Sequence, residues 1–427
     1  MTKWETKKLK DICSKITDGA HLSPPSVVQG LPMASVKDLT EYGIDLTSCR
    51  HISEADYIKL VKSGCKPKKG DILIAKDGNS AIDTTCEVRE DMDVVLLSSV
   101  AILRPKPDKL LPTFLKHLLS WSSFKNYIKQ NFITGAAIPR VILKDFGECD
   151  ISIPPLPVQR KISAVLSAYD DLIENNTRRI ALLEKMAEEI YREWFVRLRF
   201  PGHEQVTFHK GIPEDWEVKR LSELVTTQYG YTASAEDQEI GPKFLRITDI
   251  VPTVIDWSAV PYCKVPESEL KKYLLNEGDI VVARTGATVG YAKRIHKLHL
   301  SAVFASYLVR LKPKSPEESL FLGISVESDN FKHFISQFFT GSAQPQANAK
   351  VMTFYPLLYP GRDLIRRFSL LVEPTFDQKE ALLMRNTILQ QTRDRLLTRL
   401  ISGKLSVEDL DIQFPPSMKD DAPDPQG

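Results

Sequence analysis

The sequence contains no apolar run long enough to cross a bilayer, which argues against a membrane-spanning protein. Its start, Met1 to Lys10, also lacks the charged and then apolar pattern of a secretion signal. The six cysteines include no C-x-x-C pair, so a zinc site or a disulfide framework has little support. We therefore expect a cytoplasmic protein with reduced, structural cysteines and no bound metal.

A strong excess of positive charge is missing too. The net charge is only +2, so composition alone supports a nucleic-acid partner weakly. The sequence also lacks the G-x-x-x-x-G-K-[ST] loop that holds nucleotide phosphates. It has no Asn/Asp-Pro-Pro-aromatic tetrapeptide of the kind with which amino-methyltransferases hold a flipped base. These absences predict a binding protein with no catalytic residues and no cofactor of its own.

Two segments offer alternatives to that interpretation. Asp71, Lys76 and Asp77 loosely resemble a metal-nuclease motif, but Ile74 stands where its second acidic residue would be. The glycine-rich run from Arg284 to Gly290 could form a phosphate cradle, yet no helix evidently follows to supply its N-terminus. We expect a strand, a turn and a second strand there.

Four similar blocks occur twice in the same order at nearly constant spacing. A chance likeness between two strand-rich domains would explain one such block but not four, so we expect a duplicated domain. The matching pairs are Trp4-Glu5 and Trp216-Glu217, Lys69–Gly78 and Glu277–Gly286, Ser98–Lys106 and Ser306–Lys314, and Phe132–Gly135 and Phe339–Gly341.

Each repeat combines short β-rich runs with a helical stretch, which predicts an α+β fold. The expected strands lie within 93–103, 280–283 and 307–311, and the expected helices within 111–130 and 317–339.

Helices are expected after each repeat. The first begins at the proline cluster 154–157 and runs to about Arg199, with an apolar seam from Ile162 to Trp194 that only Asn176 interrupts. Asn176 either specifies the register of a coiled coil or lies at a frayed, exposed position. The second helix spans 378–401, carries Asn386 on its apolar face, and ends at Gly403. The two helices should fold back on each other as an antiparallel pair with pseudo-twofold symmetry.

Several motifs within this layout are similar to those of one protein family. They are Ile153–Ile162, Thr392–Leu405, Asp18–His21 with Pro24, Arg284–Gly290 and Gly341–Pro345. With the arrangement of repeat, helix, repeat and helix, they make the chain resemble the specificity subunit of a type I restriction-modification enzyme. One departure is that Ile365 stands where the first helix has Gln159, although Arg366 matches Arg160.

The resemblance implies a domain plan and a set of partners. Residues 1–152 and 206–358 would be target-recognition domains, and 153–205 and 359–408 would be helical regions. The proline- and aspartate-rich composition of the end of the chain predicts a disordered tail at 409–427. Each recognition domain would bind one half of a split, asymmetric site in double-stranded DNA. The helices would set the spacer and hold two modification subunits that use S-adenosylmethionine, and restriction subunits that use ATP and Mg²⁺ would join them. The expected partner-binding residues are Gln159, Arg160, Asn176, Arg366, Asn386 and Arg393.

DNA contacts are expected from basic, amide and hydroxyl side chains on loops at equivalent places in the two repeats. Solvated strand ends and ordinary surface turns are the alternatives. The candidates in the first repeat are Thr17, Asp18, His21, Lys76, Thr134, Gly135 and Arg140. Those in the second are Tyr229, Tyr231, Arg246, Thr248, Arg284, Thr285, Thr340, Gly341, Ser342, Gln344 and Gln346.

Three other functions remain open on the sequence. The chain could be a non-catalytic coiled-coil scaffold, a standalone DNA-binding protein, or a nuclease or methyltransferase with an unfamiliar site. A scaffold accounts for the helices but not for the duplicated loops.

Overall fold

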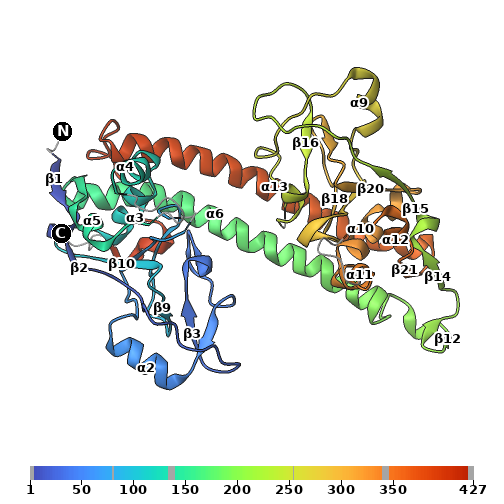
Figure 1. The fold of residues 1–427 in the computed structure, drawn as a ribbon, viewed down its shortest axis with the longest axis horizontal. Coiled ribbons are helices and arrows are strands. Elements are labelled where there is room, and N and C mark those ends of the chain that lie inside the picture. The colour runs from blue at the N-terminus through green and yellow to red at the C-terminus, as the bar shows by residue number, and fades with distance from the viewer. Residues whose placement is uncertain (1–3, 79–80, 133–139, 253, 339–345, 422–427) are drawn as a thin grey trace. The chain divides into compact units, whose positions relative to one another are not determined.

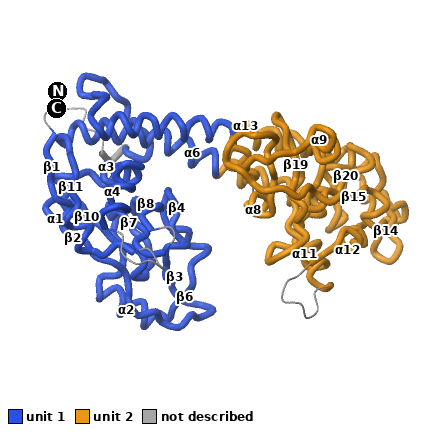
Figure 2. Tube along the Cα trace, turned by 45° about the horizontal axis from the view of Figure 1, so that its top comes forward, with its two compact units in different colours: residues 1–177, 384–427 blue, residues 178–383 orange. Residues whose placement is uncertain are grey.

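The computed structural model describes residues 4–78, 81–132, 140–252, 254–338 and 346–421 (Figure 1). The chain divides into two compact units, which are described separately (Figure 2). Unit 1 consists of Met1–Thr177 and Met384–Gly427, and unit 2 of Arg178–Leu383. No helix among the described residues is both long and apolar enough to cross a membrane.

Unit 1 is built on a four-stranded sheet in the order β2-β10-β7-β8. A parallel pair, β3 with β9, and an antiparallel pair, β1 with β11, flank it. The strands are β1 Glu5–Lys8, β2 Cys13–Asp18, β3 Leu31–Ala34, β4 Leu39–Thr40, β5 Gly43–Ile44, β6 Arg50–Ile52, β7 Ile72–Ala75, β8 Thr85–Glu87, β9 Val95–Leu96, β10 Val100–Pro105 and β11 Asp150–Ile153. The short helices are α1 Leu9–Ile12, α2 Glu54–Lys62, α3 Pro112–Ser120, α4 Ser122–Phe132 and α5 Leu143–Glu148.

Unit 2 repeats this architecture, with a four-stranded sheet in the order β15-β20-β17-β18 and a parallel pair of β16 with β19. Its strands are β12 Phe208–His209, β13 Ile212–Pro213, β14 Glu217–Arg220, β15 Val225–Tyr229, β16 Lys243–Leu245, β17 Ile280–Ala283, β18 Ala292–Arg294, β19 Ala302–Phe304, β20 Leu308–Pro313 and β21 Pro356–Tyr359. Its short helices are α7 Leu221–Leu224, α8 Ile247–Ile250, α9 Glu267–Tyr273, α10 Ser319–Glu327, α11 Asp329–Ser336 and α12 Ala349–Thr353.

The identical strand order in the two units confirms the predicted duplication and the α+β fold. Even the register is repeated: Ile74 pairs with Ala101 in unit 1, and Val282 pairs with Val309 in unit 2. Each predicted helical stretch is divided in two. The break falls at Trp121 between α3 and α4, and at Ser328, whose side chain caps α11 by accepting from the Phe331 N–H.

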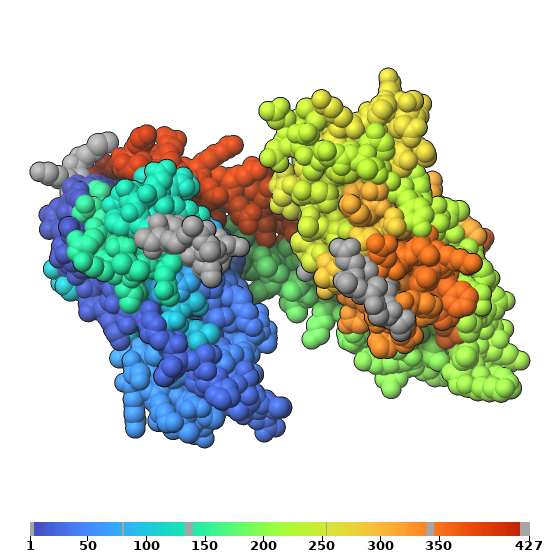
Figure 3. All heavy atoms as spheres, viewed as in Figure 1, coloured from blue at the N-terminus to red at the C-terminus, as the bar shows by residue number. Residues whose placement is uncertain are grey.

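The buried side chains of each unit form separate clusters. The largest cluster of unit 1 packs α3 and α4 against the first half of the long helix α6 (Leu156–Tyr191) and the end of α13 (Arg362–Ile401). The corresponding cluster of unit 2 packs α10 and α11 against the end of α6 and the start of α13. The segments that carry α2 and α9 lie at the far end of their own units from these helices (Figures 1 and 3).

The long helices differ from the expected lengths. Helix α6 continues into a π-helical turn, Arg192–Val196, close to the expected end at Arg199. Helix α13 begins at Arg362, earlier than the start at Gln378 that the apolar pattern predicts, and within the helical region 359–408 that the resemblance implies. The apolar side chains of its first turns enter the core of unit 2, and Pro374 lies inside the helix, so the sequence pattern concealed this part. Gly403 follows the helix with a left-handed φ of +71°, as its predicted role requires.

Disorder was expected from residue 409 onward, and the described part of the tail contradicts it as far as Met418. Lys161 donates hydrogen bonds to the carbonyl oxygens of Glu408 (2.6 Å) and Leu410 (2.8 Å). Phe414 packs against the main cluster of unit 1, and Met418 is 1% exposed. The composition is poor in apolar residues, but those few suffice to attach the segment to α6. Residues 422–427 lie outside the described residues.

Candidate nucleic-acid interface

Two strand ends meet at the same corner of each four-stranded sheet. In unit 1, β2 ends at Asp18, and Lys76 directly follows β7. In unit 2, β15 ends at Tyr229, and Arg284 directly follows β17. The backbone holds the two cations alike, since the Lys76 N–H donates to Ser99 O (2.9 Å) and the Arg284 N–H to Tyr307 O (3.0 Å). We call these places the unit 1 corner and the unit 2 corner.

The unit 1 corner is a cluster of paired charges. Lys76 Nζ lies 3.3 Å from Asp18 Oδ2 and 3.5 Å from Asp77 Oδ2, and its side chain is only 4% exposed. Arg140 Nε donates to Asp77 Oδ1 at 2.9 Å, which raises the pKa of Arg140 above its usual value. His21 Nε2 lies 3.3 Å from Asp18 Oδ1. Lys76 was predicted to extend toward DNA. In this arrangement its side chain is instead buried between two carboxylates.

The unit 2 corner replaces the charge pairs with an aromatic contact. The Arg284 guanidinium lies over the Tyr229 ring, 4.9 Å from its centroid, a cation–π distance. Its Nη1 is 3.5 Å from Ser306 O, and its Nε has no hydrogen-bond partner among the described residues. The Tyr229 hydroxyl accepts from the Ala349 N–H at 3.1 Å, which fixes the ring.

A returning segment closes each corner from the same side. Asp77 forms a β-bridge with Arg140 in unit 1, and Thr285 forms one with Gln346 in unit 2. The next backbone N–H groups, of Val141 and Ala347, donate to Lys76 O (3.0 Å) and Arg284 O (2.9 Å). The predicted residues Thr134, Gly135, Thr340, Gly341, Ser342 and Gln344 lie outside the described residues.

A glycine is required beside each corner. A Cβ on Gly19 would lie 2.1 Å from Leu96 O, and one on Gly230 would lie 2.2 Å from Ala305 O, both far inside contact distance. The neighbouring residues bridge in parallel to equivalent positions, Ala20 to Leu97 and Tyr231 to Ala305. Gly230 was not singled out in the sequence, although its place after Tyr229 matches that of Gly19 after Asp18.

The remaining predicted contacts lie on or beside these elements. Thr17 is within β2, opposite Ile102. Tyr231 packs against Tyr273 in a tilted arrangement, with ring centroids 5.1 Å apart. Arg246 follows β16 and pairs with Asp249 through two hydrogen bonds of 3.0 and 2.9 Å, so its charge is compensated within the unit. Thr248 Oγ1 also donates to Asp249 Oδ1, at 3.3 Å.

The aspartates of the duplicated Gly-Asp motif have a structural role. Asp71 accepts two 2.7 Å bonds from Arg104 and one of 2.8 Å from the Lys68 N–H. Asp279 likewise accepts from the Asn276 N–H (2.9 Å) and from Arg310 (3.2 Å). Both aspartates are buried at the start of their strands. Among the described residues, no group of three or more acidic, histidine or cysteine side chains could hold a metal ion.

The Gly-rich run after β17 is a strand, a turn and a strand, as expected. The turn Gly286–Thr288 is a short 3-10 helix, and β18 follows it.

Several of the predicted partner-binding residues on α6 and α13 form hydrogen bonds within the chain. The buried Gln159 accepts from the Leu111 N–H (2.9 Å) and donates to Lys109 O (3.0 Å) and Pro154 O (2.8 Å), so its amide fixes the start of α6. Ile365, its counterpart, is fully buried in the core of unit 2, where packing replaces those bonds. Arg160 Nε is buried and has no hydrogen-bond partner among the described residues.

Asn176 and Asn386 bind each other across the helix pair of unit 1, so the alternative of a frayed position for Asn176 is wrong. Asn176 Nδ2 donates to Asn386 Oδ1 at 2.9 Å. Asn386, which is 8% exposed, also donates to Ile173 O (3.4 Å) and Thr177 Oγ1 (3.3 Å).

Arg393 belongs to a buried charge network of unit 1. Asp170 accepts from Arg393 Nη1 at 2.8 Å and from Lys116 Nζ at 2.6 Å. Burial alone would raise the pKa of Asp170, but Lys116 and Arg393 together hold it below its usual range. The neighbouring His117 is fully enclosed, and burial lowers its pKa to about 3. This network connects α3, α6 and α13.

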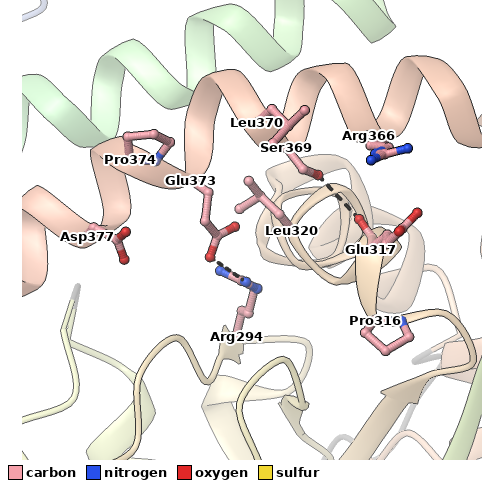
Figure 4. A pocket seen from close by; sticks show the side chains of 10 residues that line it. All are labelled: Arg294, Pro316, Glu317, Leu320, Arg366, Ser369, Leu370, Glu373, Pro374 and Asp377. Carbon is pink, nitrogen blue, oxygen red and sulfur yellow. Dashed lines mark hydrogen bonds and ion pairs between the residues drawn. The ribbon is translucent and has the colours of Figure 1, made fainter.

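Arg366 is exposed and lines a shallow pocket within unit 2 (Figure 4). The pocket lies between α13 and the segment before α10. Arg294 donates to Glu373 at 2.9 Å and Ser369 donates to Glu317 O at 3.3 Å, so its polar walls are largely satisfied.

Comparison with known proteins identifies the architecture. The family model described as the type I restriction modification DNA specificity domain matches residues 1–185 and 213–361. The MjaIX specificity subunit of a type I restriction enzyme from Methanocaldococcus jannaschii is 24% identical, over 95% of this chain and 94% of that protein. The MjaVIII specificity subunit of the same organism is 26% identical, over 83% of this chain and 84% of its own length. In fold, the S subunit of a type I restriction-modification system from M. genitalium matches 93% of this chain and 96% of its own, with a TM-score of 0.57 and 15% identity.

Proposed function

Since this chain belongs to the family of type I restriction-modification DNA specificity proteins and shares their role in DNA sequence recognition, we propose that its two recognition domains read the two halves of a split DNA site. Residues 1–152 would read one half and residues 206–358 the other. The chain is the non-catalytic member of its system.

One observation carries the proposal. The two corners are equivalent in backbone geometry but differ in side-chain chemistry. Asp18, Lys76, Asp77 and Arg140 of unit 1 correspond to Tyr229, Arg284, Thr285 and Gln346 of unit 2. Base readout depends on the donors and acceptors that a protein presents to base edges. Equivalent scaffolds with different side chains therefore suit an asymmetric site.

The proposal extends to partners. Two modification subunits that use S-adenosylmethionine would dock on the regions 153–205 and 359–408, and restriction subunits that need ATP and Mg²⁺ would join the complex. Arg160 and Arg366 are the residues we assign to this docking, because they occupy matching positions in the first turns of α6 and α13. Gln159, Asn176, Asn386 and Arg393 support it from within by fixing the helices.

The test is to co-express the chain with a modification subunit encoded beside it and to locate methylated bases by long-read sequencing of the host DNA. We expect one split motif with a fixed, non-specific spacer. A stable complex without new methylation would contradict the proposal and favour a scaffold role.

A second measurement separates a specificity subunit from an enzyme. The purified chain alone, incubated with DNA, Mg²⁺ and S-adenosylmethionine, is expected neither to nick DNA nor to transfer a methyl group. Activity from a homogeneous sample would refute the assignment.

A further inference from the structure

The two corners present their charges in different ways. We infer, on the basis of the proposed function, that Lys76 is a positioning residue that directs Arg140 and His21 toward DNA in unit 1, whereas its counterpart Arg284 reads DNA itself in unit 2. The inference assigns different tasks to two residues that the sequence places at one repeated position.

Burial keeps Lys76 away from DNA. Its side chain is 4% exposed and lies against Asp18 and Asp77, whose side chains are 9% and 19% exposed. Breaking these pairs would leave buried carboxylates uncompensated, which is strongly unfavourable. Lys76 therefore stays in place when DNA arrives, and its positive charge cancels part of the negative charge that would otherwise repel phosphates.

The two carboxylates point their second partners outward. Asp77 holds Arg140 Nε at 2.9 Å, and the Arg140 side chain is 53% exposed. Asp18 holds His21 Nε2 at 3.3 Å, and the His21 side chain is 72% exposed. Each exposed side chain is thus tethered by a carboxylate that Lys76 fixes. A preoriented arginine or imidazole donor suits the acceptor atoms of a guanine edge or a phosphate.

In unit 2, Arg284 would contact DNA directly and not through other side chains. It forms no ion pair among the described residues, and Tyr229 supports its guanidinium from one face. The counterparts of Asp77 and Arg140 are the uncharged Thr285 and Gln346, so neither position supplies a carboxylate to the guanidinium. Arginine bonded to guanine O6 and N7 is the commonest specific contact of this type. A guanine in the half-site of unit 2 is the expected partner of Arg284.

The experiment selects bound duplexes from a library of random base pairs, using the full-length chain in complex with its modification subunit. The variants are R140Q, K76M, K76R and R284Q, with K59Q as a control on an exposed basic side chain, 76% exposed, outside both corners and outside the docking regions. Thermal unfolding of each variant is measured in parallel.

We expect R140Q to change base preference in one half of the motif by about 10- to 100-fold, and R284Q to do so in the other half. K76M should change the same half as R140Q, and K76R should restore it in part, while K59Q changes neither. A purely structural Lys76 would lower the unfolding temperature and the affinity without changing which bases are selected.

The inference is overturned if R140Q leaves both halves unchanged, if R140Q and R284Q alter the same half, or if K76M affects stability only. Should K76M fail to fold, R140Q still decides, because its side chain is exposed. If the wild-type complex selects no split motif at all, the proposed function itself fails, and that outcome is distinct from a failure of the variants alone.

Discussion

Asn176 and Asn386 form a side-chain hydrogen bond of 2.9 Å between α6 and α13 of unit 1, in a seam whose other members are mainly apolar. Two amides that satisfy each other fix the register of a helix pair, because any shift leaves both without a partner. The pair therefore lowers stability compared with an apolar seam but fixes the register of α6 against α13.

Replacing one member of this pair should destabilise unit 1. In N176L, Oδ1 of the nearly buried Asn386 loses the Asn176 Nδ2 donor, and we expect a loss of about 1–3 kcal/mol in the free energy of unfolding. The double variant N176L/N386L should recover that loss or exceed the wild type. Urea denaturation measures both. A double variant no more stable than N176L would show that the amides do not act as a pair.

Asp170 should be among the most sensitive positions of the chain. D170N leaves Lys116 and Arg393 without their shared carboxylate in a buried place, which should cost about 3–5 kcal/mol of unfolding free energy. The matched control is E189Q on the same helix, whose exposed pairs with Arg192 and Arg197 should contribute less than about 1 kcal/mol. Equal effects of the two variants in chemical denaturation would contradict the importance of burial.

Acid should weaken unit 1 before the carboxylates as a class are protonated. His117 has a folded pKa of about 3, against about 6.5 in the unfolded chain, so the unfolded state binds more protons between these values. The free energy of unfolding should then fall as the pH falls below 6.5, with a slope approaching about 1.4 kcal/mol per pH unit. Asp170, whose folded pKa lies below its usual value, adds a loss in the same direction at still lower pH.

The measurement is the denaturation midpoint at several pH values from 7 to 4. H117Q, which cannot titrate, should have a flatter profile between pH 6.5 and 4 than the wild type. Parallel profiles for the two proteins would assign the acid sensitivity to other groups.

Adding a methyl group beside either corner should disturb only the unit that contains it. G19A and G230A place a Cβ 2.1 and 2.2 Å from a backbone oxygen, far inside van der Waals contact. The backbone cannot move aside as a flexible side chain can. We expect a loss of about 1–3 kcal/mol or more. Hydrogen exchange resolved along the chain should show faster exchange in β2 and β10 for G19A, and in β15 and β20 for G230A. G211A, at a glycine with open space around it but a φ of +81°, serves as a control for backbone strain alone.

The duplication could be predicted from the sequence because it is visible in local features, namely the turn residues and the composition of the strands. Gly70-Asp71 and Gly278-Asp279 form the same turn with left-handed glycines, and buried four-residue strands follow both. Turn chemistry and strand composition are local, so the repeat and the α+β class followed from them. The apolar pattern placed the start of α13 too late, at Gln378, because the first turns of this helix are helical through packing in unit 2 despite Pro374.

The corners were located correctly as strand ends, but their chemistry was not predictable. Whether a lysine lies free or between two carboxylates depends on which strand ends the fold brings together, and Asp18 reaches Lys76 from the end of β2, while Asp77 is its neighbour in the chain. The same reason applies to Gln159, whose three hydrogen-bond partners come from a loop and from the turn before its own helix. Such contacts are set by the fold and leave no periodic trace in the sequence.

Unit 2 is one continuous stretch of chain, whereas unit 1 needs both Met1–Thr177 and Met384–Gly427. During synthesis, all of unit 2 has been made once Leu383 is added, while the seam around Ile162 and Leu166 still lacks Leu397 and Leu400. The domain that is translated first is therefore the one that completes its core last. Translation that terminates before Met384 would release a chain whose unit 2 is complete and whose unit 1 cannot close.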